Sequence, residues 1–332
     1  MLRRGLTLRR AVNPRVAPIA PPLLSHRPLS HRAPHSTMSD AEIARQLVEA
    51  GVCAEVTQRG GSVWTTDKGR CFVKVGTGGS SAAAQLLKYE AEGLARMAAA
   101  APSLSVPKPW LAADAGGSGF IVMDFIDMGR RSGDYLNRLG AGLAELHLAP
   151  PADPAQTFGF PMDGCCGALA QPNNAAGRQM SWVEFWREFR LGHQLGEAKK
   201  QYPGDSQLQE LGAQLSSRLD ELFSMINVED IRPSLLHGDL WSGNYAADAA
   251  GRPTIYDCAC YYGHYEADHG INYMFGGGDA FRNKGYQAAL PPEPGYERRA
   301  LLYELHHHLN HYNIFGSGYR SGCLSLMQRI LA

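Results

Sequence analysis

The spacing of hydrophobic residues predicts three elements in the first third of the chain. Every second residue from 71 to 75 falls on one apolar face, which predicts a strand over 70–75. Apolar residues then recur every three or four positions, which predicts a helix over 81–100 that ends before Pro102. Residues 120–125 form a continuous apolar run of strand length. A short helix over 41–50, closed by Gly51, precedes them.

The rest of the chain is predicted to be mostly helical. Amphipathic patterns predict helices over 137–148, 182–202 and 207–226, and two short strands flank the turn at 248–251. Residues 150–178 are rich in Pro, Gly and Asn and are predicted to be a long ordered loop. The expected fold class is therefore α+β with two lobes. A small β-rich N-terminal lobe with a hinge strand spans 38–126, and a larger, mainly helical lobe spans 127–332.

Charge separates the first 37 residues from the rest. The 332-residue chain has equal numbers of basic and acidic residues, but seven arginines and no acid precede Asp40. This Arg-rich, Ser- and Pro-containing segment predicts a disordered organelle transit peptide over 1–37. Two alternatives stay open: residues 1–37 are a plain basic tail, or the protein starts at Met38 and is cytoplasmic.

The predicted mature chain has 25 basic and 32 acidic residues, which argues against sequence-independent binding to nucleic acid. No stretch approaches the ~18 consecutive apolar residues of a membrane span. Seven cysteines in a chain of this length do not form a disulfide scaffold, and we expect them to be reduced. Redox activity of Cys53 or Cys71 is the alternative.

The strongest chemical signal lies between residues 235 and 257. His237 to Asn244 has the form His-x-Asp-x-x-x-x-Asn, and a predicted strand then ends in Asp257, thirteen residues beyond Asn244. Phosphoryl transfer from ATP requires a carboxylate to orient the attacking hydroxyl and oxygen ligands for Mg²⁺. Asp239 is therefore the predicted base, and Asn244 and Asp257 are the predicted Mg²⁺ ligands.

Upstream residues supply the other parts of a nucleotide site. Lys74, on the strand after the turn at Gly60 and Gly61, is predicted to reach the ATP phosphates. Glu90 lies sixteen residues later on the predicted helix and would hold the lysine side chain. The run that receives the adenine through its backbone is predicted to comprise Met123, Asp124, Phe125 and Ile126.

These motifs resemble those of the fructosamine kinases, which are ketosamine and protein-ribulosamine 3-kinases related to the aminoglycoside and choline phosphotransferases. The matching segments are 235–244, 259–264, 266–268, 309–313 and 315–320, and the likeness to plant-type members is strongest. The resemblance implies a protein-kinase-like fold and the use of ATP and Mg²⁺. It also implies phosphorylation of the 3-hydroxyl of sugar adducts on lysine, in proteins or as free amino acids, which destabilises the adduct. A chloroplast location is expected, with the mitochondrion as an alternative, for a monomer or homodimer.

The same segments contain candidates for a polyol pocket, with structural packing as an equally good interpretation. These are Trp241, Tyr262, His264, Glu266, Asp268 and Arg320. A helix with histidines at 306, 307, 308 and 311 is interpreted as packed or facing the substrate rather than as a zinc site, because no acid or cysteine nearby in the sequence completes a ligand set.

Two departures from the family pattern leave other functions open. Asp257 is followed by Cys258 where the family usually has proline, and the segment from Gly60 to Lys74 is about six residues shorter than the pattern. A short glycine loop is expected to align the γ-phosphate poorly, with weak nucleotide affinity and low turnover. The alternatives are a kinase for an amino-sugar or choline-like alcohol, and a pseudokinase that only binds nucleotide.

Overall fold

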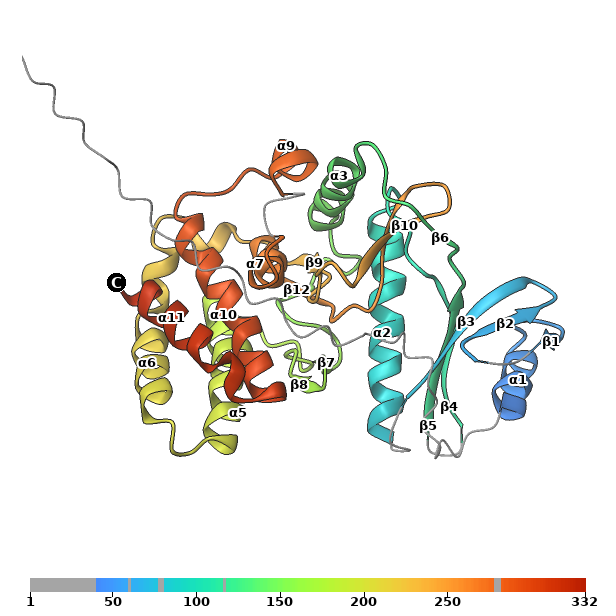
Figure 1. The fold of residues 1–332 in the computed structure, drawn as a ribbon, viewed down its shortest axis with the longest axis horizontal. Helices are drawn as coiled ribbons and strands as arrows, with labels where there is room; N and C mark the ends of the chain where they lie inside the picture. The colour runs from blue at the N-terminus through green and yellow to red at the C-terminus, as the bar shows by residue number, and fades with distance from the viewer. Residues whose placement is uncertain (1–39, 59–60, 77–80, 116–117, 278–281) are drawn as a thin grey trace, which may run out of the picture.

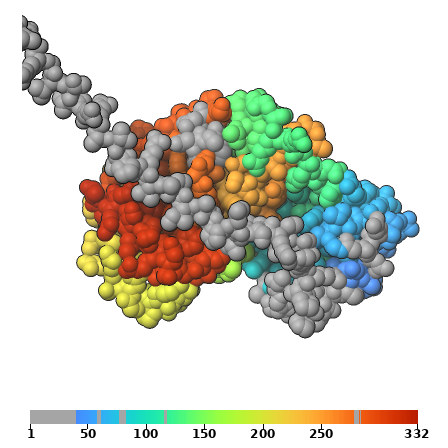
Figure 2. Space-filling model, viewed as in Figure 1, coloured from blue at the N-terminus to red at the C-terminus, as the bar shows by residue number. Residues whose placement is uncertain are grey.

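The computed structural model describes residues 40–332 except 59–60, 77–80, 116–117 and 278–281. A β-sheet region formed by the N-terminal residues lies at one end of the molecule, and the C-terminal helices lie at the other (Figures 1 and 2). Within the described residues, no helix is long and apolar enough to cross a membrane. The predicted transit peptide and Gly60 lie outside the described residues.

The N-terminal sheet is antiparallel, with strand order β1-β2-β3-β5-β4. Two helices cover it: α1 contacts β4, and the long α2 packs on β4 and β5 and lies between the sheet and the C-terminal region (Figure 1). The bounds are α1 (Asp40–Glu49), β1 (Val56–Gln58), β2 (Val63–Thr66), β3 (Gly69–Val75), α2 (Ser81–Ala100), β4 (Pro109–Ala115) and β5 (Ser118–Asp124). The predicted strands and helices in this region are confirmed to within two residues.

Strand β5 shows why its sequence is a continuous apolar run. Phe120 and Val122 belong to the hydrophobic cluster that includes α1, whereas Ile121 and Met123 belong to the main cluster that includes α2. Successive side chains of a strand point to opposite faces of the sheet. Because helices cover both faces of the sheet, both sets of side chains are buried.

The C-terminal region is mainly helical, and its described residues form three small sheets, with strand orders β11-β10-β6, β12-β9 and β7-β8. Its strands are β6 (Met128–Gly129), β7 (Gly164–Cys166), β8 (Leu169–Gln171), β9 (Ser234–Leu236), β10 (Tyr245–Asp248), β11 (Pro253–Ile255) and β12 (Tyr261–Gly263). Its α-helices are α3 (Tyr135–Leu148), α4 (Trp182–Phe185), α5 (His193–Gln201), α6 (Ser206–Ser217), α7 (Gly270–Met274), α9 (Gln287–Ala289), α10 (Tyr296–Phe315) and α11 (Arg320–Leu331). The 3₁₀-helices are Leu219–Phe223, Val228–Asp230, Tyr265–His269 and Ser317–Tyr319, and two π-helical segments are Trp186–Gly192 and Arg282–Tyr286.

Three sequence-based predictions in this region are wrong. The predicted helix over 182–202 is divided by the π-helical segment Trp186–Gly192, and the predicted helix over 207–226 ends at Ser217 and is followed by the 3₁₀-helix Leu219–Phe223. The predicted loop over 150–178 contains the hairpin β7-β8. The π-helical turn carries Arg190, whose buried guanidinium donates hydrogen bonds to Pro172 O (2.8 Å) and Asn173 Oδ1 (2.8 Å). These contacts join segments far apart in the sequence, so local periodicity does not indicate them.

Buried histidines are expected to make the fold sensitive to acid. Burial, together with the charges of His147 and Arg282 and against the opposing effect of Asp268, lowers the pKa of His269 to about 3. The unfolded chain therefore binds a proton at this site between pH 6.5 and 3 that the folded chain does not, and stability falls as the pH falls. Each pH unit below ~6.5 costs up to about 1.4 kcal/mol for such a group.

Urea unfolding at pH 7.0 and 5.5 measures this effect. His269→Gln is expected to lose less stability over this interval than the wild type. An identical loss in both proteins would contradict the assignment.

Candidate active site

The predicted catalytic residue Asp239 lies on the loop between β9 and β10, whose path requires a glycine. Gly238 has φ +79°, and a Cβ atom at this position would lie 2.1 Å from the carbonyl oxygen of Ala259. Only glycine accepts both the left-handed backbone and the close approach of the neighbouring loop. The glycine between His237 and Asp239 is thus a requirement of the fold.

A buried carboxylate fixes the same loop. Asp268 accepts hydrogen bonds from the backbone N–H groups of His237 (2.9 Å) and Gly238 (2.7 Å), and its Oδ2 atom lies 3.0 Å from His147 Nε2. Burial would raise the pKa of Asp268, but the interaction with His147 and the backbone donors lower it to about 2. The group is therefore ionised, and it holds the loop through charge-assisted hydrogen bonds.

Asp239 and Asn244 contact each other directly. Asn244 Nδ2 donates to Asp239 Oδ2 (3.1 Å), to the Asp239 carbonyl (2.8 Å) and to the Asp257 carbonyl (3.3 Å). Burial raises the pKa of Asp239 to about 8, with an opposing effect of Asn244 and a smaller contribution from the charge of Asp257. A pKa in this range suits a group that accepts a proton near neutral pH.

Lys74 joins the sheet region to the catalytic loops. Its Nζ atom lies 2.8 Å from both carboxylate oxygens of Glu90 and 3.0 Å from Asp257 Oδ1. The alternation of side chains along β3 explains the contact between Lys74 and Glu90. Cys71 and Val73 face the α1 side of the sheet. Lys74 therefore faces the opposite side, where α2 carries Glu90. Burial would lower the pKa of Lys74, but the two carboxylates raise it, so the ammonium stays charged.

Close packing of α2 on the loop after Asp257 sets the distance between Glu90, on α2, and Asp257. A Cβ atom on Gly93 would lie 2.9 Å from the sulfur atoms of both Cys258 and Cys260, and Tyr89 Oη donates to the carbonyl of Cys260 (2.6 Å). Asp257 itself has φ +56°, a left-handed conformation that is uncommon for non-glycine residues, although aspartate adopts it more readily than most. Without the proline usual in the family, the loop still presents the Asp257 carboxylate to Lys74.

The donor set fits a magnesium ion. Asn244 directs its amide nitrogen toward Asp239 and the Asp257 carbonyl, which leaves the amide oxygen on the opposite side of the group. The side chain of Asp257 is half-exposed. An amide oxygen and an accessible carboxylate are hard ligands of the kind that Mg²⁺ shares with nucleotide phosphates.

The other residues predicted to contact the nucleotide lie in two places, the turn before β2 and the end of β5 with the residues that follow it. Gly61 begins the described part of the turn before β2, and its carbonyl accepts a hydrogen bond from Trp64 Nε1 (3.3 Å). Met123 and Asp124 end β5, and the Asp124 carboxylate accepts a hydrogen bond from Trp110 Nε1 (2.7 Å). Phe125 and Ile126, both partly buried, follow in the connection toward β6.

Most of the predicted substrate residues have partners inside the protein. Tyr262 Oη receives a hydrogen bond from Arg96, and His264 contacts Tyr303 Oη at 2.8 Å. Glu266 accepts two hydrogen bonds from the buried Arg299, Asp268 binds the catalytic loop, and Arg320 is paired with Asp205. Trp241 packs against Phe275, with ring centroids 5.5 Å apart, and it is partly exposed and lies two residues from Asp239. These contacts favour packing for the first five residues and leave Trp241 as the best candidate for substrate contact.

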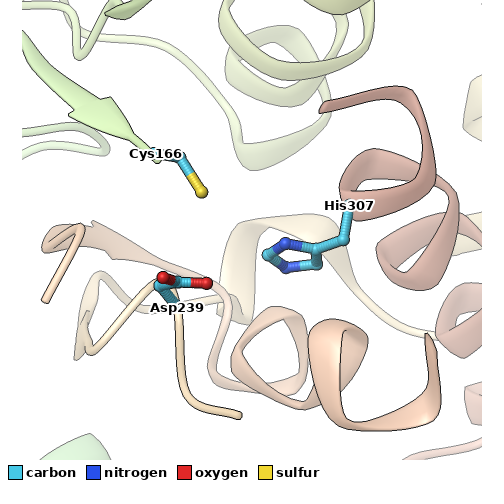
Figure 3. Close-up of side chains that lie close together, drawn as sticks. All are labelled: Cys166, Asp239 and His307. Carbon is cyan, nitrogen blue, oxygen red and sulfur yellow. The ribbon is translucent and has the colours of Figure 1, made fainter. Parts of the chain in front are cut away.

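Three further residues meet at this loop. His147 contacts Asp268 from α3, and Cys166 and His307 lie beside Asp239 (Figure 3). The sequence singles out neither His147 nor Cys166 as a site residue, and it indicates His307 only as part of a helix that is packed or faces the substrate. His147 lies in a helix whose sequence shows only an amphipathic pattern, so no local signal indicates its contact with Asp268.

Asp268→Asn distinguishes an anchoring role from a substrate-binding role. The amide has one acceptor oxygen in place of two, so a buried N–H group of the loop loses its partner, at a cost of roughly 1–3 kcal/mol of folding free energy. Urea unfolding should show this loss together with a lower kcat. A raised KM with unchanged stability would instead indicate that Asp268 contacts the substrate.

Comparisons with known proteins agree with this geometry. The family model described as fructosamine kinase matches residues 37–332. The chain is 39% identical over 307 residues to the chloroplastic protein-ribulosamine 3-kinase of Arabidopsis thaliana, covering 89% of each chain. It is 37% identical over 292 residues to the ketosamine-3-kinase of Mus musculus, covering 81% of this chain and 91% of that one.

A solved structure shows the same fold. A protein from Thermobifida fusca assigned to the fructosamine-3-kinases superposes with a TM-score of 0.73 at 27% identity, covering 88% of this chain and 99% of that one. Together with the extent of the family match, these likenesses show that the chain belongs to the fructosamine kinase family.

Proposed function

We propose that this protein is an ATP-dependent ketosamine 3-kinase that phosphorylates the 3-hydroxyl of ribulosamine or fructosamine adducts on lysine. The observation that carries the proposal is the convergence of Asp239, Asn244, Asp257 and the Lys74–Glu90 ion pair in a chain of this family. The names of the relatives from Arabidopsis thaliana and Mus musculus support the ketosamine substrate class.

Each polar group has a separate role in the proposed reaction. Asp239 accepts the proton of the 3-hydroxyl as that oxygen bonds to the γ-phosphorus of ATP and the bond to ADP breaks. Lys74, held by Glu90, contacts the ATP phosphates. Asn244 and Asp257 would hold Mg²⁺, which neutralises the phosphate charge. Phosphorylation destabilises the sugar adduct, so the free lysine amine is the expected final product.

The cellular setting is part of the proposal. The Arabidopsis relative is named chloroplastic, which supports a plastid location, with residues 1–37 as the transit peptide. Nucleotide binding is assigned to residues 38–126, and acceptor binding and catalysis to 127–332. The end of β5 at Asp124 and the pairing of β6 with β10 support a boundary near residue 126.

The arrangement gives less support to a pseudokinase. All five polar groups predicted from the sequence lie within one connected set of hydrogen bonds and ion pairs. A protein that only binds nucleotide has no need of a carboxylate in the position of Asp239.

Product analysis tests the proposal. Incubation of a ribulosylated lysine peptide with Mg-ATP should give a phosphorylated adduct by mass spectrometry, followed by the unmodified peptide. ATP consumption with an unchanged peptide would refute the proposed substrate class.

A further inference from the structure

Three side chains with metal-binding atoms converge at the predicted catalytic base. Cys166 comes from β7, Asp239 from the loop after β9 and His307 from α10, and their ligand atoms all lie within 4.8 Å of one another. Figure 3 shows the thiol, the carboxylate and the imidazole ring directed toward a common point. In the sequence, no acid or cysteine near the histidine-rich helix completes a ligand set for zinc. The fold brings Asp239 and Cys166 to His307 from distant segments.

The chemistry of this set suits zinc better than magnesium. One thiolate, one imidazole and one carboxylate, with a fourth position open, are typical ligands for Zn²⁺. Bonds of 2.0–2.3 Å in a tetrahedron place ligand atoms about 3.3–3.8 Å apart, so side-chain movements of about 1 Å would complete the site. Mg²⁺ prefers oxygen ligands, which the Asn244 and Asp257 side chains provide instead.

The surroundings prepare these ligands for a metal. His307 Nδ1 is buried and has no hydrogen-bond partner among the described residues, and Asn310 Nδ2 contacts both the sulfur (3.6 Å) and the carbonyl (3.2 Å) of Cys166. Burial lowers the pKa of His307 to about 3, so the ring is neutral, whereas burial raises the pKa of the Cys166 thiol, so a bound metal must displace the thiol proton. His311, the other histidine at i+4 spacing, directs Nδ1 to the His307 carbonyl (2.8 Å) and is not part of the set.

Access to this set of ligands is possible from one side. The residues Cys166 and His307 are 3% and 4% exposed, whereas Asp239 is partly exposed. An ion would therefore enter past the carboxylate, at the position where the acceptor hydroxyl is proposed to bind. The proton of the Cys166 thiol would pass to solvent as the metal–sulfur bond forms.

We propose that Cys166, Asp239 and His307 form an inhibitory Zn²⁺ site. Bound zinc takes the Asp239 carboxylate away from the acceptor hydroxyl and occupies part of its space, so phosphoryl transfer stops. Lys74, Asn244 and Asp257 are not ligands, so inhibition is competitive with the ketosamine and not with Mg-ATP. Zinc binding by these three residues does not depend on the proposed function, whereas inhibition of phosphoryl transfer rests on it.

Cobalt absorption tests the binding claim without any substrate. Co²⁺ titrated into the reduced full-length protein should give a thiolate-to-metal charge-transfer band that added Zn²⁺ removes. Cys166→Ser should abolish the band, and His307→Gln should weaken Co²⁺ binding at least about tenfold. Cys165→Ser is the matched control, because its side chain points to the opposite face of β7, and it should keep the band. Thermal unfolding of each variant checks that it is folded.

Two results would overturn the site: no charge-transfer band in the wild type, or a band that persists in the folded Cys166→Ser variant. A kinase assay at buffered free Zn²⁺ and saturating Mg-ATP then tests inhibition, which should be at least about tenfold weaker in Cys166→Ser. Wild-type turnover that is insensitive to Zn²⁺ would overturn the inhibitory role. Absence of kinase activity with an intact cobalt band would instead refute the proposed function and leave the metal site standing.

Discussion

Replacing Asp239 with asparagine is expected to lower kcat by about 10²–10⁴-fold while Mg-ATP still binds. The Asp239 carboxylate is the group that takes the proton of the acceptor hydroxyl in the proposed reaction. Asparagine keeps the size of the side chain and its contact with Asn244, but it does not accept the proton. The proposed nucleotide-binding groups Lys74 and Asp257 lie on other elements, on β3 and after β11, and Glu90 on α2 holds the lysine.

Steady-state kinetics measures the expected loss of kcat in Asp239→Asn, and calorimetric titration with Mg-ATP measures the affinity that this variant should retain. Asp220→Asn is a suitable control, because that carboxylate is exposed and forms a surface ion pair with Arg187. The control should retain wild-type turnover. If Asp239→Asn keeps more than about a tenth of the wild-type rate, Asp239 is not the base.

Removing the Asp257 carboxylate is expected to weaken Mg-ATP binding more than removing the Asn244 amide. An ionised carboxylate is the stronger ligand for a hard cation, and Asp257 also contacts Lys74 at 3.0 Å. In Asp257→Ala, Lys74 retains Glu90, so the remaining affinity should come from the lysine and the nucleotide base. Asn244→Ala should also lower kcat, because Asp239 loses its hydrogen-bond donor.

Calorimetry at fixed Mg²⁺ compares the variants. We expect at least about a tenfold loss of Mg-ATP affinity in Asp257→Ala and a smaller loss in Asn244→Ala. Undiminished affinity in both variants would place the metal elsewhere.

Local sequence patterns predict the parts of this site that depend on one element. The alternation over 70–75 places Lys74 on the α2 face of β3, and the helical period over 81–100 places Glu90 on the helix that meets it. The spacing from Asp239 to Asn244 and Asp257 follows from one loop and one hairpin, β10-β11, so it is also readable from the sequence.

Contacts between distant segments are the part that the sequence does not reveal. The sequence predicts Asp268 as a candidate for the polyol pocket, yet its carboxylate accepts hydrogen bonds from the backbone of the catalytic loop. His307 and Cys166 meet only because α10 and β7 both pack beside the loop of Asp239. Neither the period of α10 nor the short strand β7 contains information on this meeting.

The most direct test of the central claim is ADP release with ribuloselysine, fructoselysine and choline compared side by side. The proposed function predicts Mg²⁺-dependent ADP release with one or both sugar–lysine adducts, none with choline, and loss of the signal in Asp239→Asn. Release with choline alone would contradict the assignment as a ketosamine 3-kinase.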